Sequence, residues 1–268
     1  MTIDIKLLCE LLVESAQSEL TPRFNRCERR IKADGSLVTQ ADLAMQRRIM
    51  TRLKHLYPEI PLLGEEMPAD LQTAILNDEN RGFWCLDPLD GTANYVSGMP
   101  CFAVSLAYLV NGEVQIGIIY DPVRDELFHA VKGSGAWLNQ HRLTLSCAAD
   151  QLQECVAMVD FKRLAPVLAS QLATAPPYRS QRSIGSVALD WCWLAAGRLQ
   201  LYLHGGARLW DYAAGTLIFR EAGGHFRLGD TAAEAPTRID LGLRPRMAVA
   251  AANQRLFEAW RSWLQGFS

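Results

Sequence analysis

The sequence predicts an α+β protein, in which a largely antiparallel sheet in the N-terminal half is followed by α/β structure with a mixed sheet in the C-terminal half. Two β-rich runs, residues 102–110 and 113–121, flank Asn111-Gly112, a pair that tolerates the positive φ angles of a tight type I′ hairpin turn. Beyond residue 155, short apolar runs alternate with helical periods, as is typical of α/β structure. The polar, alanine-rich stretch "SCAADQLQE" between these regions is the expected boundary.

The N-terminal half begins with an amphipathic helix within residues 1–17, where Asp4, Glu10 and Glu14 interrupt the apolar residues. Residues 42–57 repeat apolar side chains with a helical period, and Pro58 ends this second helix. The strands expected in this half are residues 60–63, 82–86, 102–110, 113–121, 126–133 and 135–139. We therefore assign residues 1–148 to an N-terminal α+β domain.

Residues 149–268 form the predicted C-terminal α/β domain. Gly223-Gly224 marks the end of one of its helices, because glycine readily adopts the left-handed conformation of a helix C-cap. The expected strands are residues 155–160, 199–203 and 246–251, and the expected helices are residues 164–173, 186–197, 211–222 and 253–266.

Composition excludes several classes of protein. The 268 residues carry a net charge of −2, without the basic stripe that nucleic-acid binding requires. No apolar run approaches the ~20 residues that span a bilayer, and the N-terminus lacks the pattern of a secretory signal. The seven cysteines form no CxxC pair and are expected to be free thiols. A cytoplasmic protein without nucleic-acid or membrane partners is the expectation.

Four acidic segments are candidates for chemistry: Gly64-Glu65-Glu66, "DPLDGT" from Asp87 to Thr92, Trp210-Asp211, and Asp42 in "LVTQAD". Singly, they are ordinary turn sequences or helix caps. Together they are more informative, because Glu65 and Asp87 each follow a predicted buried strand. Two carboxylates ~4 Å apart repel by about 4 kcal/mol at an effective dielectric of ~20, so such a group binds either protons or cations. Oxygen ligands of this kind suit Mg²⁺.

The residues around the two aspartates favour a phosphate site. Pro88 restricts φ and helps the Leu89 carbonyl to point toward the carboxylates. Gly91 allows close backbone approach, and the N–H groups of Gly91 and Thr92 suit an anion, especially if a helix starts there. The spacing from Asp87 excludes an EF-hand loop, and no Walker loop, GxSxG elbow or paired-histidine zinc site is present.

The motifs "GEE", "DPLDGTANY" and "LWDYAAG", in this order, resemble the signature of the inositol monophosphatase family of Mg²⁺-dependent, lithium-sensitive phosphatases. "SLVTQAD", "GIIYDPVRDELF", "KGSGAWLN" and "EAGGHF" extend the resemblance over nearly the whole chain. It implies a layered αβαβα sandwich and a homodimer.

The resemblance also implies two-metal hydrolysis of a phosphate monoester, with two to three Mg²⁺ ions. Glu65, Asp87 and the Leu89 carbonyl correspond to the ligands of a first ion, and Asp87, Asp90 and Asp211 to those of a second. A third ion is expected on Glu65. Glu65 and Thr92 are expected to orient the attacking water, with Asp42 supporting Thr92. The backbone of Gly91 and Thr92 is expected to bind the phosphate.

The substrate is less well defined than the metal site. Inositol-specific members carry a glutamate seven residues before the WD aspartate, where this chain has His204. Inositol 1-phosphate or a related small phosphate ester remains the first expectation. The leucine of "DPLDGT" and the segment "KADGSLVTQAD" favour a 3′-phosphoadenosine 5′-phosphate or histidinol-phosphate phosphatase as the alternative. A non-enzymatic regulatory protein with this fold is the alternative from another class.

The other expected substrate contacts are Ser186, Asp211, Lys162 in "VDFKR" and Arg182 in "SQRSIGS". Lys162 and Arg182 either bind a second anionic group of the substrate by charge-assisted hydrogen bonds or lie at a solvated helix start.

Overall fold

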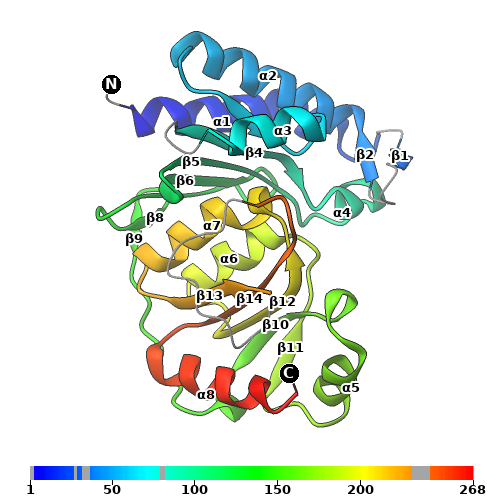
Figure 1. The fold of residues 1–268 in the computed structure, drawn as a ribbon, viewed down its shortest axis with the longest axis vertical. Coiled ribbons are helices and arrows are strands. Elements are labelled where there is room, and N and C mark those ends of the chain that lie inside the picture. Colours follow the sequence, from blue (N-terminus) through cyan, green and yellow to red (C-terminus); the bar gives the residue numbers. More distant parts are fainter. Residues whose placement is uncertain (1–2, 27–28, 32–36, 79–81, 231–241, 268) are drawn as a thin grey trace.

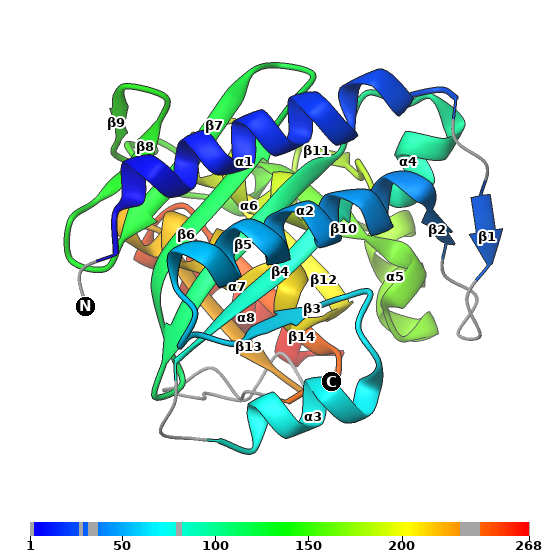
Figure 2. The same cartoon turned by 90° about the horizontal axis from the view of Figure 1, so that it is seen from above.

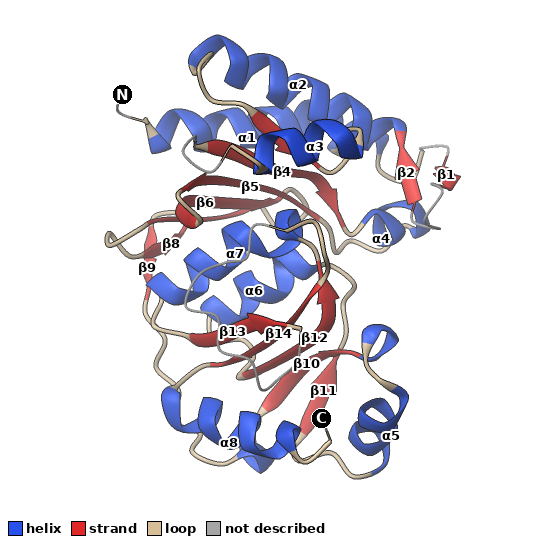
Figure 3. Cartoon of the chain, viewed as in Figure 1, coloured by secondary structure: helices blue, strands red, loops and turns tan. Residues whose placement is uncertain are grey.

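The computed structural model describes residues 3–26, 29–31, 37–78, 82–230 and 242–267. Five layers follow one another along the long axis: helices, a sheet, helices, a second sheet and helices (Figures 1 and 3). The first layer holds α1 (Ile5–Glu19), α2 (Gln40–Leu56) and α3 (Ala69–Leu76). Helices α1 and α2 cover the outer face of the first sheet, and α3 lies beside its edge (Figure 2). The αβαβα sandwich is the predicted fold class.

The first sheet has seven strands in the order β3-β4-β5-β6-β7-β8-β9. Asn111 and Gly112 have φ angles of 52° and 74°, which confirms the predicted hairpin turn between β5 and β6. The β3–β4 pair is parallel, unlike the rest of the sheet, because the chain between these strands crosses over through α3. The strands of the first sheet are β3 (Leu62–Gly64), β4 (Phe83–Asp90), β5 (Ala103–Val110), β6 (Glu113–Asp121), β7 (Glu126–Val131), β8 (Ala136–Leu138) and β9 (His141–Leu143).

Strand β4 continues to Asp90, so the prediction that it ends at Leu86 and gives way to a turn was wrong. Asp87 pairs with Ser105 and Asp90 with Ala103, so β4 carries one extra residue between these two pairs. Pro88 has no N–H to donate to the ladder, which makes an irregularity here inexpensive. In a regular strand, residues three apart point to opposite faces. The extra residue changes this alternation and allows Asp87 and Asp90 to share one side.

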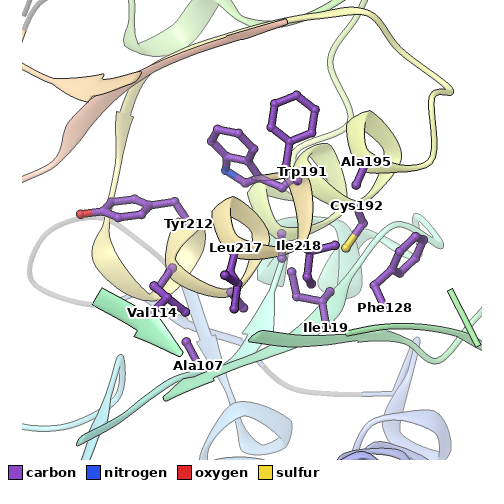
Figure 4. Packing of buried hydrophobic residues seen from close by; sticks show 14 of the residues in the cluster. Ala107, Val114, Ile119, Phe128, Trp191, Cys192, Ala195, Tyr212, Leu217 and Ile218 are labelled. Atoms are coloured by element: carbon purple, nitrogen blue, oxygen red, sulfur yellow. The ribbon is translucent and has the colours of Figure 1, made fainter. Parts of the chain in front are cut away.

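The middle layer consists of α6 (Val187–Ala195) and α7 (Leu209–Glu221), which lie between the two sheets. Trp191 and Cys192 of α6 and Leu217 and Ile218 of α7 belong to one buried apolar cluster with side chains of the first sheet, including Ile119 (Figure 4). This layer comes from the C-terminal half of the chain but packs on the N-terminal sheet. One hydrophobic core therefore includes residues from both sides of the predicted domain boundary at residue 148. The division into two domains stays a prediction.

The second sheet is mixed, with the order β11-β10-β12-β14-β13. Strand β10 pairs in parallel with β11 and β12, whereas β14 pairs antiparallel with β12 and β13. These strands are β10 (Val156–Asp160), β11 (Ser180–Arg182), β12 (Leu201–Ala207), β13 (His225–Gly229) and β14 (Arg246–Ala251). The outer layer holds α5 (Pro166–Thr174) and α8 (Gln254–Gln265).

The remaining elements are short. They are the strands β1 (Arg29–Ile31) and β2 (Leu37–Thr39), the helix α4 (Thr92–Ser97), and 3₁₀ turns at Thr21–Arg23, Leu152–Glu154 and Phe161–Arg163. Among the described residues no helix is both long and apolar enough to cross a membrane. The six cysteines in the described ranges are free thiols, as predicted, and Cys27 lies outside those ranges.

The contact between β6 and α7 gives a test of how the middle layer is held. A Cβ atom on Gly117 would lie 2.6 Å from the Ala214 carbonyl oxygen, so Gly117→Ala must push α7 away from the sheet. We expect a loss of roughly 1–3 kcal/mol in the free energy of unfolding, the usual cost of overpacking. Urea unfolding measures it. Gly266→Ala, whose added Cβ has its nearest neighbour at 3.4 Å, is the control and should change little.

Candidate active site

Three carboxylates lie close together where the end of strand β4 in the first sheet meets the start of helix α7 in the middle layer. Asp87 and Asp90 come from the end of β4, and Asp211 lies in the first turn of α7. One oxygen of each lies within 4.8 Å of the others, a spacing that suits a bound metal ion. The first sheet and the middle layer thus each supply part of the group.

Glu65 reaches the same place from the neighbouring strand. Gly64, the last residue of β3, pairs with Leu86, and the Glu65 N–H donates to the Leu86 carbonyl oxygen at 3.1 Å. The end of β3 therefore lies beside Leu86 of β4, which brings Glu65 next to the segment that carries Asp87, as expected from the sequence, although β4 itself continues to Asp90. Glu65 lines the same cavity as the three aspartates.

The electrostatic setting of the cluster favours protons or cations. Burial, and then the charges of Glu65, Asp90 and Asp211, raise the pKa of Asp87 well above its usual value. Burial is also the main cause that raises the pKa of Asp90 to about 6. For Asp211, burial and the charges of Asp90 and Glu65 raise the pKa to about 7. Without a cation, the cluster therefore holds protons near neutral pH.

Hydrogen bonds from the chain itself hold one oxygen of each aspartate. Asp87 Oδ1 accepts from the Leu89 N–H at 2.9 Å, and Asp211 Oδ2 accepts from the Arg208 N–H at 2.8 Å. Asp90 Oδ2 accepts from the Ala188 N–H at 2.9 Å and from the Ser186 hydroxyl, both at the start of α6. These bonds orient the carboxylates before any ligand arrives.

Thr92 and Asp42 are joined beside the cluster. The Thr92 hydroxyl lies 3.1 Å from Asp42 Oδ1 and 3.0 Å from the Leu89 carbonyl oxygen. The other oxygen of Asp42 accepts from the Thr39 N–H at 2.7 Å and from the Thr39 hydroxyl at 2.6 Å, which forms a capping box at the start of α2. Asp42 is thus a buried link between α2 and Thr92.

The glycine of "DPLDGT" could not be another residue without distortion. Gly91 has a φ of 88°, and a Cβ there would lie 2.8 Å from the Cys101 carbonyl oxygen. A short helix, α4, starts at Thr92 directly after it. Both Gly91 and Thr92 line the cavity, which places their backbone beside the acidic cluster.

A cavity of about 960 Å³ opens from the cluster toward the second sheet. Among the residues predicted to contact the substrate, Ser186, His204 and Lys162 line it together with Gly91, Thr92 and Asp211. Arg182 is exposed, and its guanidinium donates to Ser180 Oγ at 2.7 Å and the Gln181 carbonyl at 2.8 Å. It is not among the lining residues, because β11 is the edge strand of the sheet. Of the segment "KADGSLVTQAD", residues 32–36 lie outside the described ranges.

Asp160 and Arg163 of the segment "VDFKR" also line the cavity, beside Lys162. Two further lining residues, Arg208 and Asp190, were not singled out from the sequence. Asp190 is the only charged residue in the apolar helix α6, and that pattern could have marked it as a buried polar group with a special role. Burial raises its pKa well above the usual value.

Comparisons with known proteins identify the family to which this fold and its acidic site belong. The family model described as "Inositol monophosphatase family" matches residues 4–261, and the chain belongs to this family.

Three individual proteins show the range of the similarity. The chain is similar to the protein named Nus factor SuhB of Pasteurella multocida, with 38% identity over 199 residues that cover 72% of each chain. A crystal structure of extragenic suppressor protein suhB from Bartonella henselae superposes with a TM-score of 0.83 at 26% identity, over 98% of this chain and 99% of that one. IMPase-II of Staphylococcus aureus, solved with 2′AMP bound, has a TM-score of 0.80 at 25% identity, over 97% and 94% of the two chains.

The raised pKa values predict how a divalent cation stabilises the protein. In the unfolded chain the aspartates titrate near 3.8, whereas Asp90 and Asp211 titrate near 6 and 7 in the folded protein. Their contribution to stability is therefore complete below pH 3.8 and is lost as the pH rises through 6 and 7. We expect Mg²⁺ to raise the melting temperature more at pH 8 than at pH 5.5, because fewer protons compete with it.

Thermal unfolding with and without Mg²⁺ at the two pH values measures this effect. The double variant Asp87→Asn/Asp211→Asn should lose most of the pH dependence of the Mg²⁺ effect. An equal Mg²⁺ shift at both pH values in the wild type would contradict the prediction.

Proposed function

We propose that this protein is a Mg²⁺-dependent phosphate monoester hydrolase, with inositol 1-phosphate or a related small phosphorylated metabolite as its substrate. The observation that carries the proposal is the group formed by the buried Asp87 and Asp90 and the partly buried Asp211, with Glu65 beside them, at the end of a cavity large enough for a small metabolite. Membership of the inositol monophosphatase family supports it. A cytoplasmic homodimer remains our expectation.

The donor set fits Mg²⁺. All the side-chain ligands are carboxylates, the ligand type that Mg²⁺ prefers. Burial, and then the charges of the neighbouring carboxylates, raise the pKa values of Asp87 and Asp211, and a cation would stabilise their charged forms. Glu65, Asp87 and the Leu89 carbonyl would hold one ion, and Asp87, Asp90 and Asp211 a second. Mg²⁺ at these positions supplies an activated water and neutralises the charge of the leaving alcohol.

The residues around the ions then have distinct tasks. Thr92 can orient a water molecule. Its hydroxyl group can donate a hydrogen bond to Asp42, and the lone pairs of the hydroxyl oxygen can then accept a hydrogen bond from the water. Glu65 can accept a proton from the same water. The N–H groups of Gly91 and Thr92 would bind the phosphate, because both residues line the cavity beside the carboxylate cluster at the start of α4.

Substrate choice depends on the other end of the cavity. IMPase-II of Staphylococcus aureus has been solved with 2′AMP bound, so a relative with this fold can hold a nucleotide monophosphate. This finding keeps 3′-phosphoadenosine 5′-phosphate in the group of candidates with histidinol phosphate. The volume of about 960 Å³ admits all of them.

A regulatory or interaction protein is the second candidate function. The curated relative from Pasteurella multocida bears the name Nus factor, which describes a factor rather than an enzyme. The phosphatase function and the regulatory function are compatible, because an acidic site between the first sheet and the middle layer leaves the outer helix layers available for a partner.

Phosphate release from a panel of esters separates these candidates. The panel contains myo-inositol 1-phosphate, histidinol phosphate, 3′-phosphoadenosine 5′-phosphate and fructose 1,6-bisphosphate, each with Mg²⁺, with EDTA and with Mg²⁺ plus lithium. We expect turnover of at least one ester that EDTA abolishes and lithium inhibits. No release from any ester would favour the regulatory function.

Asp90→Asn is expected to abolish turnover while preserving the fold. The asparagine oxygen can still accept from Ser186 and the Ala188 N–H, so the link to α6 survives. Its amide nitrogen would then face the cluster, where it cannot ligate Mg²⁺. Phosphate release and the melting temperature should be measured together. The exposed Asp150→Asn is the matched control, and near-normal Mg²⁺-dependent turnover by Asp90→Asn would refute the metal assignment.

A further inference from the structure

The segment "DPLDGTANY" contains a polar residue, Asn94, that belongs neither to the acidic cluster nor to the lining of the cavity. Asn94 is the third residue of α4. Its side-chain amide donates one hydrogen bond to the Cys101 carbonyl oxygen at 2.7 Å and another to the Ile184 carbonyl oxygen at 2.6 Å. Both amide protons are therefore used, and both acceptors belong to the main chain.

The two acceptors determine which way the amide group of Asn94 points. If the amide were turned by 180°, its oxygen would face two carbonyl oxygens, and no proton would lie between them. Asn94 therefore serves as a double donor at this position. A side chain of similar size that lacks these protons, such as leucine or an ionised aspartate, cannot make the same bonds.

The carbonyl groups that Asn94 binds belong to the two segments that enclose Gly91. A Cβ atom on Gly91 would lie 2.8 Å from the Cys101 carbonyl oxygen and 3.4 Å from the Gly185 carbonyl oxygen. Gly185 follows Ile184 directly in the chain. Asn94 thus connects the same two segments between which the backbone of Gly91 is packed.

The loop that contains Ile184 is a firm support, because α6 begins directly after it. Ser186 is the N-cap of α6, and its hydroxyl group donates to Asp90, as does the Ala188 N–H at 2.9 Å. Most side chains of α6 are buried in the middle layer. Helix α6 is therefore the fixed side of this contact, and α4, which has only six residues, is the side that Asn94 holds.

The next residue along the chain, Tyr95, anchors α4 on the opposite side. Its ring is fully buried and packs on Phe102, with the ring centroids 4.9 Å apart, and its hydroxyl group donates to the Leu20 carbonyl oxygen at 2.6 Å. Leu20 is the C-cap of α1, so Tyr95 holds α4 to the outer helix layer. Without the hydrogen bonds of Asn94, α4 should therefore stay folded but shift relative to α6.

We propose that Asn94 is a positioning residue for hydrolysis, which fixes Thr92 relative to Asp90 and the start of α6. The inference rests on the proposed phosphatase function, in which Thr92 orients the attacking water. Thr92 is already joined to the N-terminal half by Asp42. Asn94, two residues further along α4, adds the connection to the C-terminal half that the attack requires.

Two variants of similar size, Asn94→Leu and Asn94→Asp, test this role in the hydrolysis of myo-inositol 1-phosphate and of p-nitrophenyl phosphate. At pH 8.5 each should lower kcat by roughly 10- to 100-fold, the usual cost of misplacing a group that orients a reactant. The loss should be equal on the two esters, because Asn94 acts on the phosphate end that both share. The Mg²⁺ concentration for half-maximal activity should change by less than about twofold, since the aspartates keep their own main-chain donors.

The pH dependence separates the hydrogen bonds of Asn94 from its packing. A carboxyl group between two carbonyl oxygens is favoured in its neutral form, which can donate one hydrogen bond. The loss of kcat in Asn94→Asp, relative to the wild type at the same pH, should therefore shrink from pH 8.5 to pH 6, whereas the loss in Asn94→Leu should stay constant. Asp90 and Arg124, which donates to the Pro100 carbonyl oxygen at 2.9 Å, are present in both variants and do not by themselves produce this difference.

Ser97→Ala is the matched control. Ser97 is exposed on the same helix, and its hydroxyl group also donates to a main-chain carbonyl, that of Asn94, at 3.2 Å, but this bond stays within α4. Its kcat should remain within about twofold of the wild type. Melting temperatures show whether each variant has folded. Full activity of Asn94→Leu, equal losses in both Asn94 variants at both pH values, or a comparable loss in Ser97→Ala would overturn the inference.

Amide hydrogen exchange without Mg²⁺ or ester tests the connection independently of turnover. Asn94→Leu should speed the exchange of residues 91–94 and of residues 184–186 together. Faster exchange in the variant, without hydrolysis of either ester by the wild type, would show that the connection exists but would refute the proposed activity and thus a role in hydrolysis. Hydrolysis by the wild type, with unchanged kcat and unchanged exchange in the variant, would overturn the inference and leave the proposed activity standing.

Discussion

The structure depends on holding like charges together. Asp87, Asp90 and Asp211 have oxygens within 4.8 Å of one another in a buried place. A pair of carboxylates at ~4 Å repels by about 4 kcal/mol at an effective dielectric of ~20. The chain opposes this repulsion with fixed donors: Asp90 accepts from the start of α6, whose positive end favours an anion, and Asp211 is held by the first turn of α7. The acidic cluster is therefore inseparable from the middle helix layer.

That dependence explains the order of the layers. Helices α6 and α7 must have apolar surfaces toward both sheets, and the large cluster that contains Trp191 and Phe219 includes side chains from each. Close packing of Gly117 against the α7 backbone sets the distance between that helix and the first sheet, and hence the position of Asp211 relative to β4. The N-terminal sheet cannot complete the acidic cluster without this layer, because Asp211 belongs to α7. A division of the chain at residue 148 would thus separate Asp211 from its partners.

Local patterns in the sequence predicted most of the elements and the acidic group. The Asn111-Gly112 hairpin and the buried strands that lead to Glu65 and Asp87 follow from short-range rules. The features that were missed depend on pairing between distant segments. The bulge in β4 is defined only against β5, and the contact of Asp160 with His204 requires the register of two strands that are far apart in the chain. Arg182 was given a substrate contact because its edge-strand position is invisible without the sheet order.

The two ends of the cavity are built in different ways, and this has a consequence for specificity. At the end with the acidic cluster, each aspartate is oriented by a hydrogen bond from the main chain. At the other end, Asp160 is held by the Lys162 N–H and also by a side chain of the next strand, His204. The contact of His204 Nε2 with Asp160 Oδ2 links β12 to β10, so this wall of the cavity depends on the pairing of two strands. Substitutions in β10 and β12 can therefore alter this wall and leave the acidic cluster intact.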